Sequence, residues 1–205
     1  PIVLEDLEGQ DLGEKIDGPT NQANHIRHEF GDIDRGFAEA DLVIEREFTT
    51  SMVHQGYIEP HNATASWDEE GRITIWTSTQ GSFPTRQQVA GILRLADSQV
   101  KVIPLEIGGG FGGKIPTYLE PVAAILSRES GRPVKLLMER SSVFEATGPT
   151  PGSWMMAKVG VKKDGTITAA DTDIRFEAGA YPGSPVGAAM MCVFACYDIP
   201  NTRID

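Results

Sequence analysis

Five glycines lie within the six positions 108–113, in the stretch Gly-Gly-Gly-Phe-Gly-Gly-Lys that we term the glycine loop (residues 108–114). Glycine has no Cβ atom, so such a run can adopt positive φ angles and let its backbone N–H groups approach another group closely. A strand-like segment precedes the loop, and a segment with helical periodicity follows it. Because a glycine-rich turn joined to a helix typically binds an anion, the loop predicts a phosphate or oxyanion site. A purely structural turn is the alternative.

The hydrophobic pattern on both sides of the loop predicts an α+β (mixed α/β) chain, in which β-hairpins pack with a few helices. Strands are expected at residues 41–50, 63–67, 72–77, 100–107, 134–138, 153–163 and 166–176, and helices at 84–95, 118–130 and 186–197. Pro104 predicts an edge position or a bulge for its strand, because proline cannot donate a ladder hydrogen bond. Thr117 and Glu120 have the spacing of a capping box, which predicts the start of a helix near Tyr118. The strand at 134–138 is expected to be short and buried.

Composition excludes several classes of protein. The 205 residues carry a net charge of −11, from 18 basic and 29 acidic side chains, whereas a nucleic-acid-binding surface needs clustered Lys and Arg. The longest apolar run, residues 186–197, is shorter than the roughly 20 residues of a membrane span. Cys192 and Cys196 are the only thiols, and two cysteines cannot hold an iron–sulfur cluster. Both are expected as small core residues on one face of a buried helix.

The N-terminal segment has neither an initiator methionine nor the basic and apolar pattern of a signal peptide. We therefore expect the chain to be a piece of a longer protein. Residues 1–22 are acidic and rich in turn-forming residues, so they are interpreted as a linker or as the end of a preceding small domain.

A dinucleotide-binding pattern overlaps the glycine loop and provides an alternative function. Gly108, Gly110 and Gly113 satisfy G-x-G-x-x-G. Glu139 ends a later predicted strand, at about the distance expected for an acid that binds a ribose. Together they predict a non-catalytic module that binds NAD or FAD. The predicted helix start near Tyr118 argues against it, since the loop of a dinucleotide-binding fold runs directly into its helix.

Four further motifs accompany the loop in a fixed order. They are His-Gln-Gly-Tyr-Ile-Glu-Pro-His at 54–61, Trp-Thr-Ser-Thr-Gln at 76–80, Gly-Arg-Pro-Val-Lys at 131–135 and Ala-Cys-Tyr-Asp-Ile-Pro-Asn at 195–201. With the loop, they resemble the molybdenum-binding large subunit of the xanthine dehydrogenase and aldehyde oxidase family. The carbon monoxide dehydrogenase and 4-hydroxybenzoyl-CoA reductase branches look most similar. The resemblance covers residues 23–205 and implies the N-terminal portion of a molybdopterin-binding domain.

This resemblance implies an oxidoreductase, a molybdenum hydroxylase that binds the molybdenum–molybdopterin cofactor. Such an enzyme hydroxylates an aldehyde, aromatic or heterocyclic substrate with water as the oxygen source. The pterin rather than the protein holds the metal, so His54 and His61 are expected to have structural roles. Iron–sulfur clusters and FAD are expected only on partner domains or subunits, and the location is expected to be cytoplasmic.

The resemblance also assigns the cofactor-binding residues, namely Gln80, Gly109, Gly110, Phe111 and Gly112. Gln80 is expected to donate an amide hydrogen bond to an oxygen or sulfur atom at the metal. The backbone N–H groups of Phe111 and Gly112 are expected to stabilise negative charge on oxygen. A third hypothesis is a scaffold that only docks partner subunits, and it is favoured if Gln80 and Phe111 lie far apart.

Two departures from the family pattern concern the expected substrate pocket. Ile115 and Ala188 stand where purine-oxidising members carry a substrate-binding Glu and Arg. An apolar or aromatic substrate, or a thioester, is therefore expected. The family's general-base Glu and second cofactor loop are expected beyond Asp205, so the isolated piece is expected to be inactive and to hold the cofactor weakly. Lys114 is expected to lie in solvent.

Overall fold

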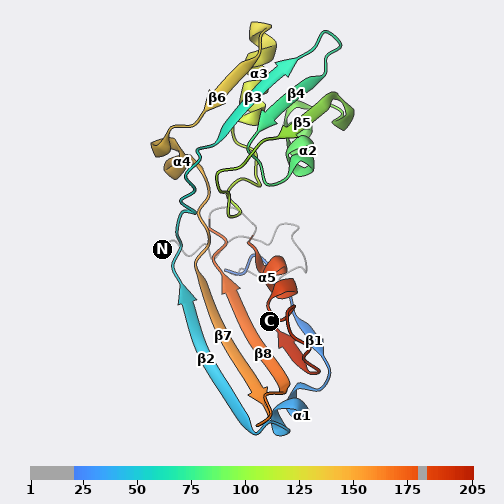
Figure 1. Cartoon of the computed structure of the whole chain (residues 1–205), viewed down its shortest axis with the longest axis vertical. Coiled ribbons are helices and arrows are strands. Elements are labelled where there is room, and N and C mark those ends of the chain that lie inside the picture. The colour runs from blue at the N-terminus through green and yellow to red at the C-terminus, as the bar shows by residue number, and fades with distance from the viewer. Residues whose placement is uncertain (1–20, 180–183) are drawn as a thin grey trace. The chain divides into compact units, whose positions relative to one another are not determined.

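The computed structural model describes residues 21–179 and 184–205 (Figure 1). The chain forms two compact units, of which unit 1 comprises residues 1–52 and 151–205 and unit 2 comprises residues 53–150. The predicted linker at 1–22 lies outside the described residues except for its last two. The mixed α/β class is confirmed, because each unit combines a β-sheet with helices.

Unit 2 is built on a four-stranded sheet with the order β5-β4-β3-β6. Its strands are β3 (Asn62–Trp67), β4 (Ile73–Thr77), β5 (Val100–Pro104) and β6 (Val134–Leu137), and its helices are α2 (Ser82–Leu93), the 3-10 helix η1 (Asp97–Gln99), α3 (Glu120–Ser130) and α4 (Arg140–Ala146). The expected hairpin of β3 and β4 is antiparallel. β5 pairs with β4 in parallel, after a crossover through α2. This crossover brings the end of β5, from which the glycine loop departs, beside the end of β4.

The local sequence pattern predicted the position of one edge strand of this sheet correctly and the burial of the other wrongly. β5 ends at Pro104 and lies at the sheet edge, as the proline predicted. The expectation that residues 134–138 form a buried strand is wrong. β6 pairs only with β3, and 65% of the Leu137 side chain is exposed. An apolar run does not distinguish an edge strand from a central one, because only the number of neighbouring strands decides its burial.

Helix α3 begins two residues later than expected, and the predicted capping box is absent. Its N-cap is Leu119, with no side-chain cap. The Glu120 carboxylate instead accepts hydrogen bonds from the Tyr118 N–H at 2.9 Å and from the Thr77 hydroxyl at 2.8 Å. Thr77 lies on β4. The Glu120 carboxylate therefore accepts a hydrogen bond from the sheet rather than from the Thr117 N–H that the capping box predicted. The expected end of α3 is confirmed, with Gly131 as its C-cap at φ 62°.

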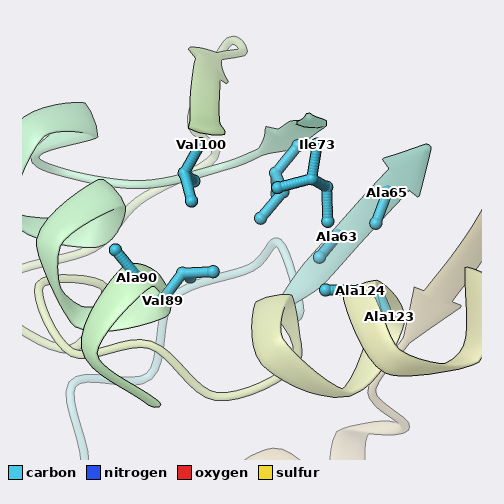
Figure 2. Packing of buried hydrophobic residues seen from close by; sticks show 9 residues of the cluster. Ala63, Ala65, Ile73, Val89, Ala90, Val100, Ala123 and Ala124 are labelled. Carbon is cyan, nitrogen blue, oxygen red and sulfur yellow. The ribbon is translucent and has the colours of Figure 1, made fainter. Parts of the chain in front are cut away.

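Small side chains allow the helices to approach the sheet of unit 2 closely. The buried cluster is Ala63, Ala65, Ile73, Ile75, Val89, Ala90, Val100, Ala123 and Ala124. Figure 2 shows the side chains of α2 and α3 directed toward β3 and β4. The alanines of α3 and β3 face each other, and the Trp67 indole N–H donates to the Ala124 carbonyl at 2.8 Å. This core anchors the strand ends and helices that flank the glycine loop.

Unit 1 contains a five-stranded sheet with the order β1-β9-β8-β7-β2. Its elements are β1 (His28–Phe30), α1 (Ile33–Ala38), β2 (Leu42–Thr50), β7 (Ser153–Val161), β8 (Ile167–Phe176), α5 (Val186–Cys192) and β9 (Thr202–Ile204). The predicted hairpin of β7 and β8 is confirmed, and Gly165 turns it with a φ of 90°. The buried Asn201 side chain accepts the Asp32 N–H and donates to the Thr168 carbonyl, each at 2.8 Å. This side chain ties the start of α1 to the sheet.

The expectation of a buried helix over residues 186–197 is wrong. Helix α5 ends at Cys192 and has no buried residue. Cys192 and Cys196 are exposed free thiols. They do not share a helical face, because residues 193–197 are not α-helical. In the part of the chain that the structure describes, no helix has the length and apolar character needed to cross a membrane.

Candidate functional site

The glycine loop lies in unit 2 between β5 and α3. The helix does not follow the loop directly, since it begins only at Glu120, after Lys114 and five further residues. Glu139, the proposed ribose ligand, is the N-cap residue of α4. β5 is an edge strand rather than a central one. This arrangement differs from a dinucleotide-binding fold, in which the glycine turn joins a central strand to the N-terminus of a helix.

The glycines of the loop meet two separate requirements. Gly109 and Gly112 have φ angles of 96° and 89°, which residues with a Cβ rarely adopt. Gly110 and Gly113 are needed for close packing. A Cβ at Gly110 would lie 2.6 Å from Gln80 Oε1, and one at Gly113 would lie 2.7 Å from Tyr57 Cε1. The loop therefore packs directly against side chains from two other segments of unit 2.

Phe111 is at the tip of the loop. Its side chain is 72% exposed, so it is not a core residue. Its φ is 50°, in the left-handed region, which costs a residue with a Cβ on the order of 1 kcal/mol. The turn is closed beneath it by the Gly113 N–H, which donates to the Gly110 carbonyl at 2.7 Å. The fold thus holds an apolar ring and a strained backbone at the surface.

Gln80 follows β4 and lies against the loop, as the sequence predicted. Its Oε1 accepts hydrogen bonds from the N–H groups of Gly112 at 3.0 Å and Lys114 at 3.1 Å. Its backbone N–H donates to the Lys114 carbonyl at 3.1 Å. Residues 32 and 34 positions apart in sequence are therefore joined by three hydrogen bonds. This convergence does not favour the scaffold hypothesis, which would have gained support if Gln80 and Phe111 lay far apart.

One expectation about the loop requires correction. The Gly112 N–H was expected to face an oxygen of a bound group, but in this structure it donates to Gln80 Oε1. The Gln80 carboxamide oxygen therefore takes up this donor within unit 2. Among the described residues, no hydrogen bond involves Gln80 Nε2 or the Phe111 N–H. These two donors, one side-chain and one backbone, remain available to a ligand at an exposed surface.

The expectation that Lys114 lies in solvent is wrong. Lys114 is only 1% exposed, and its Nζ lies 2.8 Å from Glu59 Oε2 and 5.0 Å from the centroid of the Tyr57 ring. The same Glu59 oxygen accepts the Gly108 N–H at 2.8 Å, and Oε1 accepts from Asn62 at 3.1 Å. Burial acts to raise the pKa of Glu59, but hydrogen bonds from Lys114 and Gly108 outweigh it and the pKa is lowered. The Glu59 carboxyl group is therefore ionised at neutral pH.

A buried polar network lies beside this ion pair. The Tyr57 hydroxyl is 2.6 Å from His61 Nε2 and 3.2 Å from Thr147 Oγ1, and His54 Nε2 is 2.8 Å from the same Thr147 atom. Burial lowers the pKa of His61 to about 4, and the positive charges of Lys114 and His54 add to this effect. His61 is thus neutral at pH 7, and its Nε2 can accept a hydrogen bond from the Tyr57 hydroxyl. Both histidines belong to a hydrogen-bonded structural network, as expected.

The sequence pattern identified the motif at 54–61 but predicted no role for Glu59 or Tyr57 within it. A signal for Glu59 was present, because an acidic residue in a largely neutral motif needs a partner when it is buried. Lys114, the cation at the end of the loop, is that partner. Nothing in the local pattern indicated the proximity of the two, which are 55 positions apart.

The two residues expected in the substrate pocket belong to different units. Ile115 is 49% exposed and directly follows the loop, while Ala188 is exposed on α5. The pocket itself stays a prediction. A cavity of about 310 Å³ lies between α2 and β5, and no residue of the glycine loop lines it. In the described ranges, 21–179 and 184–205, no three His, Cys, Asp or Glu side chains gather in an arrangement that could bind a metal ion.

The geometry of unit 2 defines a class of site. An exposed, strained bend is held from below by Gln80, Glu59 and Lys114, and it presents uncharged N–H donors outward. Such donors suit an oxygen-rich anionic ligand. The bend therefore has the geometry of a candidate anion-binding site.

Comparison with known proteins agrees with this class. Residues 16–205 match the model of the molybdopterin cofactor-binding domain, and the chain belongs to this family. It is 32% identical to the nicotinate dehydrogenase large molybdopterin subunit of Eubacterium barkeri, over 100% of this chain and 51% of that protein. It is similar in structure to the aldehyde oxidoreductase of Desulfovibrio gigas, with a TM-score of 0.69 and 26% identity over 87% of this chain and 20% of the other.

The predicted resemblance to carbon monoxide dehydrogenase is confirmed as well. The CO dehydrogenase of Oligotropha carboxidovorans is similar with a TM-score of 0.62 and 30% identity, over 91% of this chain and 25% of that one. The chain thus spans about half the length of the nicotinate dehydrogenase subunit and about a quarter of the CO dehydrogenase chain. The resemblance to the 4-hydroxybenzoyl-CoA reductase branch stays a prediction.

Proposed function

We propose that this chain supplies one wall of the cofactor site of a molybdenum hydroxylase. Residues 23–205 form the N-terminal portion of its molybdopterin-binding region, and residues 1–22 are a linker or the end of a preceding small domain. The observation that carries the proposal is the union of Gln80 with the glycine loop, which leaves Gln80 Nε2 and the Phe111 N–H as unused donors at an exposed bend. The family to which the chain belongs supports the same assignment.

The residues of the bend fit the cofactor in charge and shape. Gln80 Nε2 and the Phe111 N–H would donate to its oxygen or sulfur atoms without adding charge, which keeps the site neutral toward an anionic group. Gly109 and Gly112 allow the backbone to bend, and Gly110 lets the Gln80 side chain pack directly against the loop. When bound, the molybdenum–pterin group supplies the two-electron oxidation of the substrate, with water as the source of oxygen. The chain's own residues bind and orient this group.

The substrate proposed for this enzyme is an aldehyde, an aromatic or heterocyclic compound, or a thioester. Ile115 and Ala188 are uncharged, so they offer apolar contact. They replace the Glu and Arg with which purine-oxidising members of the family bind their substrate. The electrons pass to iron–sulfur and flavin groups on partner subunits or domains, and the enzyme works in the cytoplasm. The general base lies on the part of the protein that follows Asp205.

A single isosteric substitution tests the proposal. Gln80→Glu keeps an acceptor oxygen for the loop but replaces the outward NH₂ donor with a second oxygen. We expect the full-length polypeptide to contain stoichiometric molybdenum and pterin, and the Gln80→Glu variant to lose most of both. Gln87→Glu makes the same change at an exposed position of α2 and should retain them. Equal molybdenum content in the two variants contradicts the proposal.

The nucleotide-binding alternative is tested by titration of the chain with NAD. Micromolar binding of NAD would favour that alternative, and its absence supports the cofactor proposal. The 205-residue chain alone is expected to hold molybdenum weakly, because it supplies only part of the site. Stoichiometric molybdenum with hydroxylase activity in this chain alone would contradict that expectation.

A further inference from the structure

We propose that Glu59 and Lys114 are positioning residues, which together lock the glycine loop in the bent conformation before any cofactor binds. The lock rests on the geometry of unit 2. The use of the locked bend, to orient Gln80 and Phe111 toward a molybdenum cofactor, rests on the proposed function.

One carboxylate oxygen joins the two ends of the loop. Glu59 Oε2 lies 2.8 Å from the backbone N of Gly108, the first residue, and 2.8 Å from Nζ of Lys114, the last. The Glu59 N–H also donates to the Gly108 carbonyl at 3.2 Å. Glu59 thus pairs with both backbone groups of the first loop residue and with the charge of the last one. A closed loop of this kind cannot open at one end without breaking these bonds.

Burial makes the lock hard to release. The Lys114 side chain is 0% exposed and the Glu59 side chain is 29% exposed. An ammonium group removed from water is stable only when it is paired, so Lys114 depends on Glu59 more than Glu59 depends on Lys114. The loop backbone packs closely on Glu59, since a Cβ at Gly108 would lie 2.5 Å from the Cβ of Glu59. Glycine at this position lets the carboxylate reach the loop backbone.

The lock acts on the outward donors through the backbone of Lys114. The Lys114 N–H donates to Gln80 Oε1, and the Lys114 carbonyl accepts the backbone N–H of Gln80. The position of Lys114 therefore sets the orientation of the Gln80 carboxamide. Phe111 has a strained φ of 50° and an exposed ring, so its own packing contributes little to hold this conformation. The restraint comes from the ends of the loop. We therefore expect the loop to relax, and the Gln80 Nε2 donor to lose its fixed direction, when Glu59 is changed.

Hydrogen exchange on the chain purified without cofactor tests the lock. Glu59→Gln removes the charge that pairs with Lys114, whereas Glu106→Gln removes the charge of an exposed residue close to the loop. We expect the Gly112 and Lys114 amides to exchange at least tenfold faster in Glu59→Gln and at the parent rate in Glu106→Gln. Amides of β3 and β4 should keep their protection and thereby show that the core is folded. Parent-like exchange of both loop amides in Glu59→Gln overturns the proposal.

A charge-reversed pair tests whether an ion pair alone protects the loop or whether the carboxylate must also accept the Gly108 N–H. The double variant Glu59→Lys with Lys114→Glu restores opposite charges, but a lysine at position 59 cannot accept the Gly108 N–H. The lock predicts that the loop amides stay unprotected in this variant. Restored protection would show that any ion pair suffices, which overturns the role of Glu59 as the joint of both ends. If Glu59→Gln fails to fold, Glu59→Asp keeps the charge but is one methylene shorter, and the same loss of loop protection is expected with the core intact.

The lock and the proposed function fail in distinguishable ways. Hydrogen exchange without cofactor reports only on the lock. Molybdenum content of the full-length polypeptide reports on the function, and we expect Glu59→Gln to retain less molybdenum than Glu106→Gln. A parent protein without molybdenum would remove the proposed function and leave the lock standing. An ordered loop in Glu59→Gln would remove the lock and leave the function standing.

Discussion

Acidification from pH 7 toward pH 4 is expected to destabilise unit 2 through His61. This side chain is 5% exposed and hydrogen-bonded to Tyr57. Its pKa falls from 6.5 to about 4, first because burial disfavours the charged form, and then because Lys114 and His54 repel a further positive charge. Glu59 has a smaller, opposing effect. The folded state therefore resists a proton that the unfolded chain accepts.

The direction and size of the effect follow from this difference in pKa. Between about pH 6.5 and pH 4 the unfolded state binds a proton at His61 that the folded state does not, so the free energy of unfolding falls as the pH falls. Above pH 6.5 this contribution is constant. Multiplying the difference between the pKa values 6.5 and about 4 by about 1.4 kcal/mol per unit gives a total loss of about 3 to 4 kcal/mol, most of which is reached at pH 4. The pKa of Glu59 is lowered from 4.5 in the folded state, so its contribution to stability is complete above that pH. Below pH 4.5, protonation of Glu59 lowers the free energy of unfolding further.

Urea unfolding at several pH values between 7 and 4.5 measures this loss without interference from Glu59. Trp67 and Trp76 report on unit 2 when Trp154 of unit 1 is replaced by Phe. We expect the pH dependence to be largely absent in His61→Gln and fully present in His28→Gln, which changes an exposed histidine. The reasoning is refuted if His61→Gln keeps the parent slope, or if NMR shows that His61 titrates near pH 6.5.

Three further predictions concern stability and are measured by urea unfolding, with Trp67 and Trp76 reporting on unit 2 and Trp154 reporting on unit 1. Gly91→Ala should raise the free energy of unfolding by about 0.5–1 kcal/mol, because Gly91 lies inside α2 and a Cβ there meets open space; a loss would contradict this. Ile75→Ala, at a fully buried position, should cost about 2–5 kcal/mol, whereas Ile92→Ala, at a 59% exposed one, should cost less than about 0.5 kcal/mol. Asn201→Ala should cost about 2 kcal/mol or more in unit 1, because two backbone groups lose their partner, and a neutral effect would show that water replaces it.

Local pattern predicted most elements of the fold because their determinants are adjacent in sequence. The hairpin of β7 and β8 follows from alternation and from a glycine that adopts a positive φ at the turn. The end of α3 follows from Gly131. The same reasoning failed for α5, where an apolar run of the right composition does not continue as one helix. It also failed for β6, whose burial depends on neighbours that the local sequence does not specify.

The candidate site was predicted in part. The glycines of the loop and the resemblance of five ordered motifs identified Gln80 and Phe111, and the structure brings them together. The use of the Gly112 N–H was predicted wrongly, because the Gln80 side chain itself takes up this donor. Glu59 was missed, since its partner Lys114 is distant in sequence and a lysine at the end of a loop is usually solvated.

The amino-acid sequence by itself determined that a glycine-rich bend follows a strand, because backbone freedom is a property of the glycines alone. It also determined the family, because the motifs and their order are written in the chain. Only the tertiary structure decided which groups hold that bend. A carboxylate and an ammonium group far apart in sequence become partners because the fold removes the Lys114 ammonium group from water, and a buried charge needs a partner.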